Sequence, residues 1–217
     1  MNRYRVFLFI LTATLWACDK VPQLGPATDE SLATASEDSC GFVQNSYGQR
    51  VSWKGQTPVS LQIHPSVPTE FDPAILEAAS TWEDAAGQKL FHIQRVYNTP
   101  TSQEPQKDAG NFIYALLEWD QSLSSQQAVT NIYWRQSQIN EADIKINLKN
   151  YDYALSDQSS PHQIHLKSLL VHELGHFLGL KHQTTVPSVM WTVLLTGVNR
   201  SALTEADKAS LRCGYSL

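Results

Sequence analysis

The chain has 217 residues, a formal net charge of −5, and 42% hydrophobic and 17% charged residues. This length allows one domain of ordinary size, or one domain with a tail. The composition is that of a globular protein and excludes wholesale disorder. The acidic balance, without a cluster of lysine and arginine, argues against nucleic acid as the main partner.

The first seventeen residues have the pattern of an export signal. Two arginines precede an uncharged, mostly apolar run from Val6 to Trp16, which is too short to span a membrane. The run ends in Leu15-Trp16-Ala17-Cys18, which resembles the bacterial lipobox that is cut before a lipid-modified cysteine. We therefore expect residues 1–17 to be a signal peptide and the protein to be an exported cell-envelope lipoprotein, periplasmic or on the outer surface. It would meet the membrane only through a lipid on Cys18. An uncleaved anchor, or secretion with Cys18 free, would also fit this pattern.

The chain has three cysteines, one of which would be left unpaired in an oxidising compartment. If Cys18 carries lipid, Cys40 and Cys213 remain as a candidate disulfide. This disulfide would close a long loop and contribute ~3–5 kcal/mol in the chain-entropy model. Two independent, small, buried residues are the alternative.

The segment after Cys18 is rich in proline, glycine, serine and threonine and has no periodic apolar face, so we predict a flexible, lipid-anchored tether over residues 18–40. Residues 41–217 would form the folded domain. Alternating or helically spaced apolar residues predict its elements. We expect strands over 59–63, 91–96, 112–119 and 144–148, a surface loop over 98–110, and helices over 72–87, 166–178 and 205–213. This order predicts an α+β (α/β-like) domain in which the sheet precedes the main helix.

The helix predicted over residues 166–178 carries residues suited to metal chemistry. His172 and His176 lie one turn apart on the same helical face, so both imidazoles can bind one ion. Glu173 is close enough to take a proton from a water held by that ion. Gly179 can adopt the positive φ that ends a helix, which lets His182 supply a third nitrogen. Three neutral imidazoles leave one position of a tetrahedral zinc for water, which is the pattern of a catalytic site.

A buried amphipathic helix with incidental histidines is the alternative explanation of this segment. The five fixed positions should occur by chance in on the order of one in 10⁵ chains of this length. Three histidines and a glutamate on or near an apolar helix would also each need a buried partner, which is costly without a metal. The pattern therefore favours the zinc site.

The pattern His172-Glu173-x-x-His176-x-x-Gly179-x-x-His182 matches the signature of the metzincin clan of zinc endopeptidases. The resemblance implies a metzincin-type catalytic domain with a twisted mixed sheet of about four to five strands, two long helices and a C-terminal helix. It also implies one catalytic zinc held by the three histidines, with Glu173 as general base. The clan has a methionine turn beneath the zinc, and Met190 in Ser188-Val189-Met190 fits that role. An ordinary core methionine is the alternative for Met190.

Within the clan the likeness is greatest to matrixins and their bacterial relatives. Segment 141–147 is similar to the strand that those proteins place along the edge of the cleft. Segment 203–207 is similar to the start of their C-terminal helix, in which Asp207 would be a buried structural acid. The resemblance covers roughly residues 50–215 and is strongest at the zinc motif.

The sequence also departs from the matrixin pattern. Gln183 follows the third histidine where matrixins usually have serine. The inhibitory cysteine switch of matrixin propeptides is incomplete, although Cys40-Gly41 resembles its core, so a latency role for Cys40 is an alternative to the disulfide. His162 and His165 lie in a predicted loop, where we expect them to be solvated and not metal-binding. Calcium is compatible with the resemblance, but no residue pattern in the sequence supports a calcium site.

These observations predict a zinc metalloendopeptidase that acts as a monomer on extracellular or periplasmic proteins. A substrate peptide would lie extended along an edge strand over residues 143–148. The walls of a pocket beside the zinc would come from Val171, His172 and the segment after Met190, with Trp191 and residues 194–198 as candidates. Such walls would suit an apolar side chain just after the cut bond. The alternatives are a catalytically silent envelope binding module and a zinc hydrolase that acts on a non-peptide bond.

Overall fold

The computed structural model describes residues 38–98, 107–157 and 160–215 of the chain. The predicted signal peptide, the predicted lipid attachment at Cys18 and nearly all of the predicted tether lie outside these residues. Within the described ranges, no helix combines the length and the apolar character needed to cross a bilayer.

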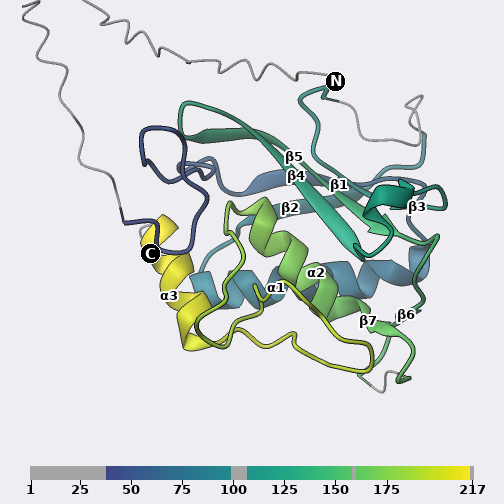
Figure 1. Ribbon diagram of the computed structural model, residues 1–217. Coiled ribbons are helices and arrows are strands. Elements are labelled where there is room, and N and C mark those ends of the chain that lie inside the picture. The colour runs from purple at the N-terminus through teal and green to yellow at the C-terminus, as the bar shows by residue number, and fades with distance from the viewer. Residues whose placement is uncertain (1–37, 99–106, 158–159, 216–217) are drawn as a thin grey trace, which may run out of the picture. The chain divides into compact units, whose positions relative to one another are not determined.

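A five-stranded mixed sheet in the order β2-β1-β3-β5-β4 forms one layer of the domain (Figure 1). Neighbouring strands from β2 to β5 are parallel, whereas β4 pairs antiparallel with β5 and lies at the edge. A separate pair of short parallel strands, β6 and β7, precedes the second helix. The strands are β1 (Val59–Ile63), β2 (Phe91–Arg95), β3 (Phe112–Leu116), β4 (Ala128–Arg135), β5 (Gln138–Asn147), β6 (Tyr153–Ala154) and β7 (Ile164–His165).

Three α-helices complete the described fold: α1 (Asp72–Ala86), α2 (Leu166–Phe177) and α3 (Glu205–Tyr215). Two short 3-10 helices, η1 (Thr69–Phe71) and η2 (Gln121–Leu123), precede α1 and β4. Proline in the first turn of α1 suits a helix start, and the helix buries Ile75 and Trp82 before it ends at Gly87. α1 and α2 lie on the same side of the sheet (Figure 1). They are joined by a hydrogen bond of 2.9 Å from Trp82 Nε1 to the carbonyl of Val171. The five-stranded mixed sheet and the three helices confirm the predicted α+β class.

The prediction of an edge strand over 143–148 is wrong. β5 lies between β3 and β4, so β4, and not β5, forms this edge of the sheet. Because β5 is buried on both faces, Ile144 and Ile146 are fully enclosed, as are the acids on the same strand. The apolar alternation in this segment identified a strand but did not show how many neighbours the strand has.

Two acids of β5 are an unusual part of this interior. Glu141 and Asp143 are buried, and each accepts one backbone hydrogen bond, from Ala109 and Phe112 respectively. The second oxygen of each carboxylate has no hydrogen-bond partner in the described part of the chain. Burial raises the pKa of Asp143 to about 7, which reduces the charge that the interior has to accommodate near neutral pH.

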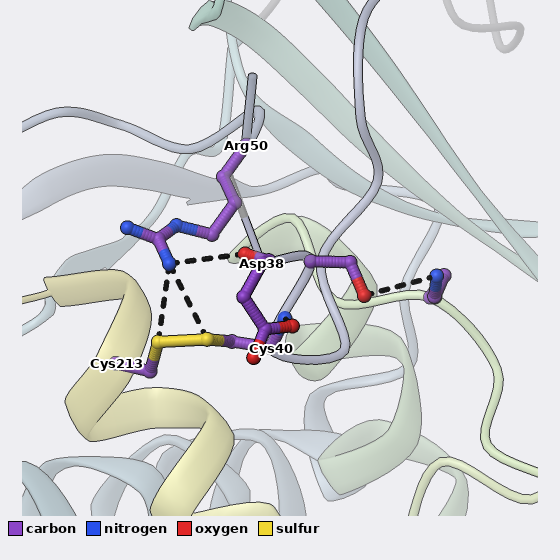
Figure 2. Close-up of a disulfide and its surroundings, with 6 residues drawn as sticks. Asp38, Cys40, Arg50 and Cys213 are labelled. Atoms are coloured by element: carbon purple, nitrogen blue, oxygen red, sulfur yellow. Dashed lines mark hydrogen bonds between the residues drawn. A yellow bond between two sulfur atoms is a disulfide. The ribbon is translucent and has the colours of Figure 1, made fainter. Parts of the chain in front are cut away.

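A disulfide joins Cys40 to Cys213 in α3 (Figure 2). The cysteines are 173 residues apart in sequence, so the chain-entropy model gives a stabilisation of about 5 kcal/mol. Figure 2 shows Arg50 beside this bond: its Nη1 donates to the carbonyl of Asp38 at 3.1 Å and lies 3.3 Å and 3.1 Å from the two sulfur atoms. In this arrangement the sulfur of Cys40 is covalently occupied and is not available as a latency ligand.

Candidate active site

The helix that carries the histidine motif begins at a buried histidine. His165 is the N-cap of α2: its Nδ1 accepts a hydrogen bond from the backbone N–H of Ser168 at 3.3 Å and lies 2.7 Å from the Ser168 hydroxyl. Its Nε2 lies 3.3 Å from the carboxylate of Asp157. The prediction that His165 is solvated is therefore wrong, since only 2% of its surface is exposed. His162 is exposed, as expected.

Three imidazoles meet at the far end of α2. His172 and His176 extend from the same face of the helix, and His182 follows after the chain has turned back. The Nε2 of His176 lies 3.1 Å from the Nε2 of His172 and 3.1 Å from that of His182. One ring nitrogen from each of the three residues lies within 4.8 Å of the others. The structure therefore brings together the three predicted metal ligands.

Hydrogen bonds to backbone carbonyls fix the orientation of the His172 and His176 imidazole rings. Nδ1 of His172 lies 2.8 Å from the carbonyl of Val189, and Nδ1 of His176 lies 2.7 Å from the carbonyl of Leu180. A carbonyl only accepts hydrogen bonds, so each Nδ1 carries the proton and each Nε2 presents a lone pair. Burial lowers the pKa of all three imidazoles, that of His172 to about 3, which keeps the rings in the neutral, metal-binding form.

These residues fit a zinc ion. Lone pairs that face one another at 3.1 Å repel unless a cation or a proton lies between them. In a tetrahedral site with Zn–N bonds of about 2.0–2.1 Å, the nitrogens are about 3.3–3.4 Å apart, close to the spacing found here. Carbonyl partners on Nδ1 are also the usual outer support of zinc-binding histidines.

Glu173 lies beside the histidines and is held by the edge strand. Its Oε2 accepts a hydrogen bond of 2.6 Å from the hydroxyl of Thr130 in β4, and its backbone carbonyl lies 3.2 Å from the same hydroxyl. Within the described residues its Oε1 has no hydrogen-bond partner. Burial raises the pKa of Glu173 to about 7, which the Thr130 bond partly offsets.

Thr130 was not anticipated from the sequence, although a signal was present. Residues 128–135 read AVTNIYWR, a run rich in β-branched and aromatic residues that is typical of a strand. A strand at this position, followed by a turn and β5, would have suggested a hairpin whose edge faces the histidine helix.

Met190 packs against α2 at Gly175, between the two histidines of the helix. It is buried, and a Cβ atom built at Gly175 would collide with its sulfur, so the close approach requires glycine at that helical position. The turn is closed by bonds from Met190 N to the Ser188 hydroxyl at 2.9 Å and from Gln183 N to the Met190 carbonyl at 2.9 Å. The structure thus places Met190 where the resemblance implies a methionine turn.

Asp207 connects this turn to α3. The carboxylate is buried and accepts hydrogen bonds from the Ser188 hydroxyl, from Val189 N at 3.1 Å and from Thr204 N at 2.9 Å. The Thr204 hydroxyl donates a further bond of 2.8 Å. Since the carbonyl of Val189 orients His172, Asp207 supports the site through the backbone of one residue.

The third histidine is positioned by a pairing with the start of the described chain. Gly179 has φ of 100°, a left-handed conformation that favours glycine and ends the helix. The chain then runs antiparallel to residues 41–43, with Val43 N donating to the Gly179 carbonyl at 2.9 Å and Lys181 N to the Gly41 carbonyl at 2.8 Å. The disulfide at Cys40 fixes the end of this pairing.

A groove of about 700 Å³ opens in front of the histidines. One side is β4 and the segment before it, and the other is the segment that follows Met190. His172, Trp191 and Leu194 line it as predicted, whereas the candidates over residues 195–198 do not. Val171 is fully buried in the core, and Leu169 lines the groove instead. The remaining lining residues include Gln127, Ala128, Thr130, Glu173, His176, His182, Thr192, Val193 and Arg200.

Among the described residues, the three histidines are the one group of three or more histidine, cysteine, aspartate or glutamate side chains that comes close enough to hold an ion. No acidic group of this kind that could hold calcium occurs in the described residues.

The fold and this site together indicate the class of zinc metallopeptidases. Residues 149–216, about a third of the chain, match the family model Matrixin (Peptidase_M10). This segment contains α2, the three histidines, Met190 and α3. The chain matches no curated protein. The family match supports a matrixin-like peptidase, and the mixed sheet with its three helices is compatible with a metzincin-type catalytic domain.

Proposed function

We propose that this chain is a zinc-dependent endopeptidase that hydrolyses peptide bonds of extracellular or periplasmic proteins. One observation carries the proposal: three imidazole nitrogens converge at a groove in which a buried glutamate is held beside them by Thr130. Because all three ligands are histidines, a tetrahedral ion keeps one position for a reactant, as in catalytic and not structural zinc sites.

Each residue has a role in the proposed mechanism. His172, His176 and His182 would hold the ion, which supplies a Lewis acid that polarises the peptide carbonyl and acidifies water. Glu173 is the general base: Thr130 holds its Oε2, and its Oε1 takes the proton from the attacking water. The same oxygen then returns the proton to the nitrogen of the leaving amine.

The substrate peptide would lie extended along β4. As an edge strand, β4 has backbone groups that are not used by a second neighbouring strand, and unlike β2 at the other edge it lines the groove. An added peptide strand would form hydrogen bonds that do not depend on the peptide's sequence. Selectivity would then come from side chains that enter the groove.

We also propose that the protein works outside the cytoplasm as a monomer, attached to a membrane by a lipid on Cys18 after removal of residues 1–17. The Cys40–Cys213 disulfide supports an oxidising compartment. Mass spectrometry of the mature protein tests the anchor. A diacylated or triacylated N-terminal Cys18 is the expected result, and an unmodified Cys18 would contradict it.

Removal of the metal tests the proposed activity. We expect the full-length protein to cleave unfolded casein, to lose at least about 99% of this activity when a chelator removes zinc, and to regain it with about one equivalent of zinc per chain. Circular dichroism before and after chelation shows whether the fold persists.

Two outcomes would contradict the proposal. Cleavage that persists in protein shown by elemental analysis to be zinc-free would exclude the metal mechanism. Well-folded, zinc-loaded protein that cleaves neither casein nor a peptide library would favour a binding module or a non-peptide hydrolase on the same scaffold.

A further inference from the structure

The groove beside the histidines has one cationic side chain that the proposed mechanism does not use. Arg200 lines the groove together with apolar residues such as Leu169, Val193 and Leu194. Among the described residues that line the groove, the only acid is Glu173, which is held by Thr130 of β4. A cation at this position would influence which substrate side chains bind in the groove. This inference rests on the proposed peptidase function.

Arg200 is fixed through its backbone and through its guanidinium. Its backbone N–H donates to the hydroxyl of Ser168 in the first turn of α2 at 2.7 Å. Its Nη1 donates to the carbonyl of Val193 at 2.8 Å, and its Nη2 donates to the carbonyl of Trp191 at 2.9 Å. Both carbonyls belong to residues 191–194, which form the wall segment of the groove. The guanidinium is therefore held at that wall in one orientation.

The guanidinium has no anionic partner in the described part of the chain. A guanidinium has five N–H donors, and the two carbonyls use two of them. No described carboxylate forms an ion pair with Arg200. Asp207, the acid whose charge acts on it, is itself occupied by donors from Ser188, Val189 and Thr204. Burial is the main influence on the guanidinium and lowers the pKa of Arg200.

A partly buried charge without a counter-ion is costly, and a carboxylate is the group that best offsets the cost, because it can accept two parallel bonds from one guanidinium. The apolar wall residues would contact the methylene groups of an entering side chain while its carboxylate reaches the arginine. A purely apolar side chain would instead bury the guanidinium further without neutralising it.

We propose that Arg200 determines specificity, and that the substrate side chain entering this groove next to the cut bond is acidic, glutamate or aspartate. The sequence alone predicts an apolar side chain at this position. That prediction rests on apolar wall residues and does not include Arg200, which lies nine positions after Trp191. The preferred substrates are then acidic extended segments of envelope or extracellular proteins.

The test measures kcat/KM for paired peptides that differ only in glutamate or leucine next to the cut bond, with both flanking positions sampled. We expect the wild-type protein to prefer the glutamate peptide by about 10- to 100-fold, as charge-assisted hydrogen bonds imply. Arg200→Gln should lower this glutamate-to-leucine ratio by at least about tenfold, whereas Arg200→Lys, which keeps the charge, should retain a preference for glutamate. Arg212→Gln, on an exposed arginine of α3, is the matched control.

The ratio separates this role from a purely structural one. If Arg200 only braces the wall through its two carbonyl bonds, Arg200→Gln lowers kcat/KM for both peptides by the same factor and leaves the ratio unchanged, which overturns the inference. A wild-type preference for leucine also overturns it while leaving the peptidase function intact. If zinc-loaded wild-type protein cleaves no peptide of the set, the proposed function fails and the inference fails with it.

Discussion

Replacing Glu173 with glutamine is expected to lower kcat/KM for peptide hydrolysis by about 10²- to 10⁴-fold while zinc remains bound. The amide has the size of the carboxylate and keeps an oxygen for the hydrogen bond from Thr130, so the groove should keep its shape. An amide cannot take a proton from water at neutral pH, so the loss falls on the proton transfer. Michaelis kinetics on a fluorogenic peptide and elemental analysis of the same preparation measure both quantities.

Glu70→Gln, on an exposed glutamate of η1, is the control for this substitution. It should retain wild-type kinetics and zinc content. A Glu173→Gln protein that cleaves within about tenfold of wild type would show that another group acts as the base. Loss of zinc from Glu173→Gln would instead show that the carboxylate contributes to binding the metal, which the convergence of the three imidazoles does not predict.

Asp207→Ala is expected to lower the free energy of unfolding by about 3–5 kcal/mol, because the substitution leaves buried donors of Ser188, Val189 and Thr204 without their acceptor. For a domain of this size the melting temperature falls by roughly 2–4 °C for each kcal/mol. Zinc affinity should also fall by about tenfold or more, since the Val189 carbonyl orients His172. Denaturant titration with the disulfide intact and zinc competition with a chelator measure the two effects.

Glu205→Ala is the matched control, because Glu205 is an exposed acid two positions earlier on the same helix. It should change stability by less than about 0.5 kcal/mol. Equal stability of Asp207→Ala and Glu205→Ala would contradict a structural role for the buried acid. Reduced stability with unchanged zinc affinity would confine that role to packing α3 and would separate it from the metal site.

The parts of the fold that were predictable from the sequence depend on local pattern. Helical spacing of Ile75 and Trp82 located α1, and the alternation of Val59, Leu61 and Ile63 located β1, because one face of each element is buried and the other is solvated. The histidine motif was predictable for a related reason: the ligands at i and i+4 are neighbours on any α-helix, so their convergence needs no tertiary information.

The parts that were not predictable depend on contacts between distant segments. β4 was missed because its residues are all partly exposed at a sheet edge, so its sequence shows no strong apolar alternation. Without a recognisable β4, the sequence pattern makes β5 look like an edge strand and does not identify Thr130 as the partner of Glu173. The sequence predicts a solvated His165 because histidine is not a usual N-cap residue. Its role as the N-cap of α2 is visible only from its contact with Ser168 in the folded chain.

The role of Arg200 has the same origin. In sequence it is the one lysine, arginine, aspartate or glutamate between Lys181 and Glu205, but no local pattern shows where its guanidinium lies. Only the return of the chain past the wall segment places its guanidinium at the carbonyls of Trp191 and Val193. Charge in a groove is a property of the folded chain, and a list of apolar wall residues could not reveal it.

The most direct test of the zinc site is the number of zinc ions bound per chain in full-length wild-type, His182→Ala and His162→Ala proteins purified without added metal. His162 is an exposed histidine outside the site, so its variant controls for loss of a surface imidazole. The three-histidine site predicts about one zinc in wild type and in His162→Ala, and less than about 0.2 in His182→Ala, since two imidazoles alone bind zinc weakly. Well-folded wild-type protein without zinc, or His182→Ala with the wild-type amount, would contradict it.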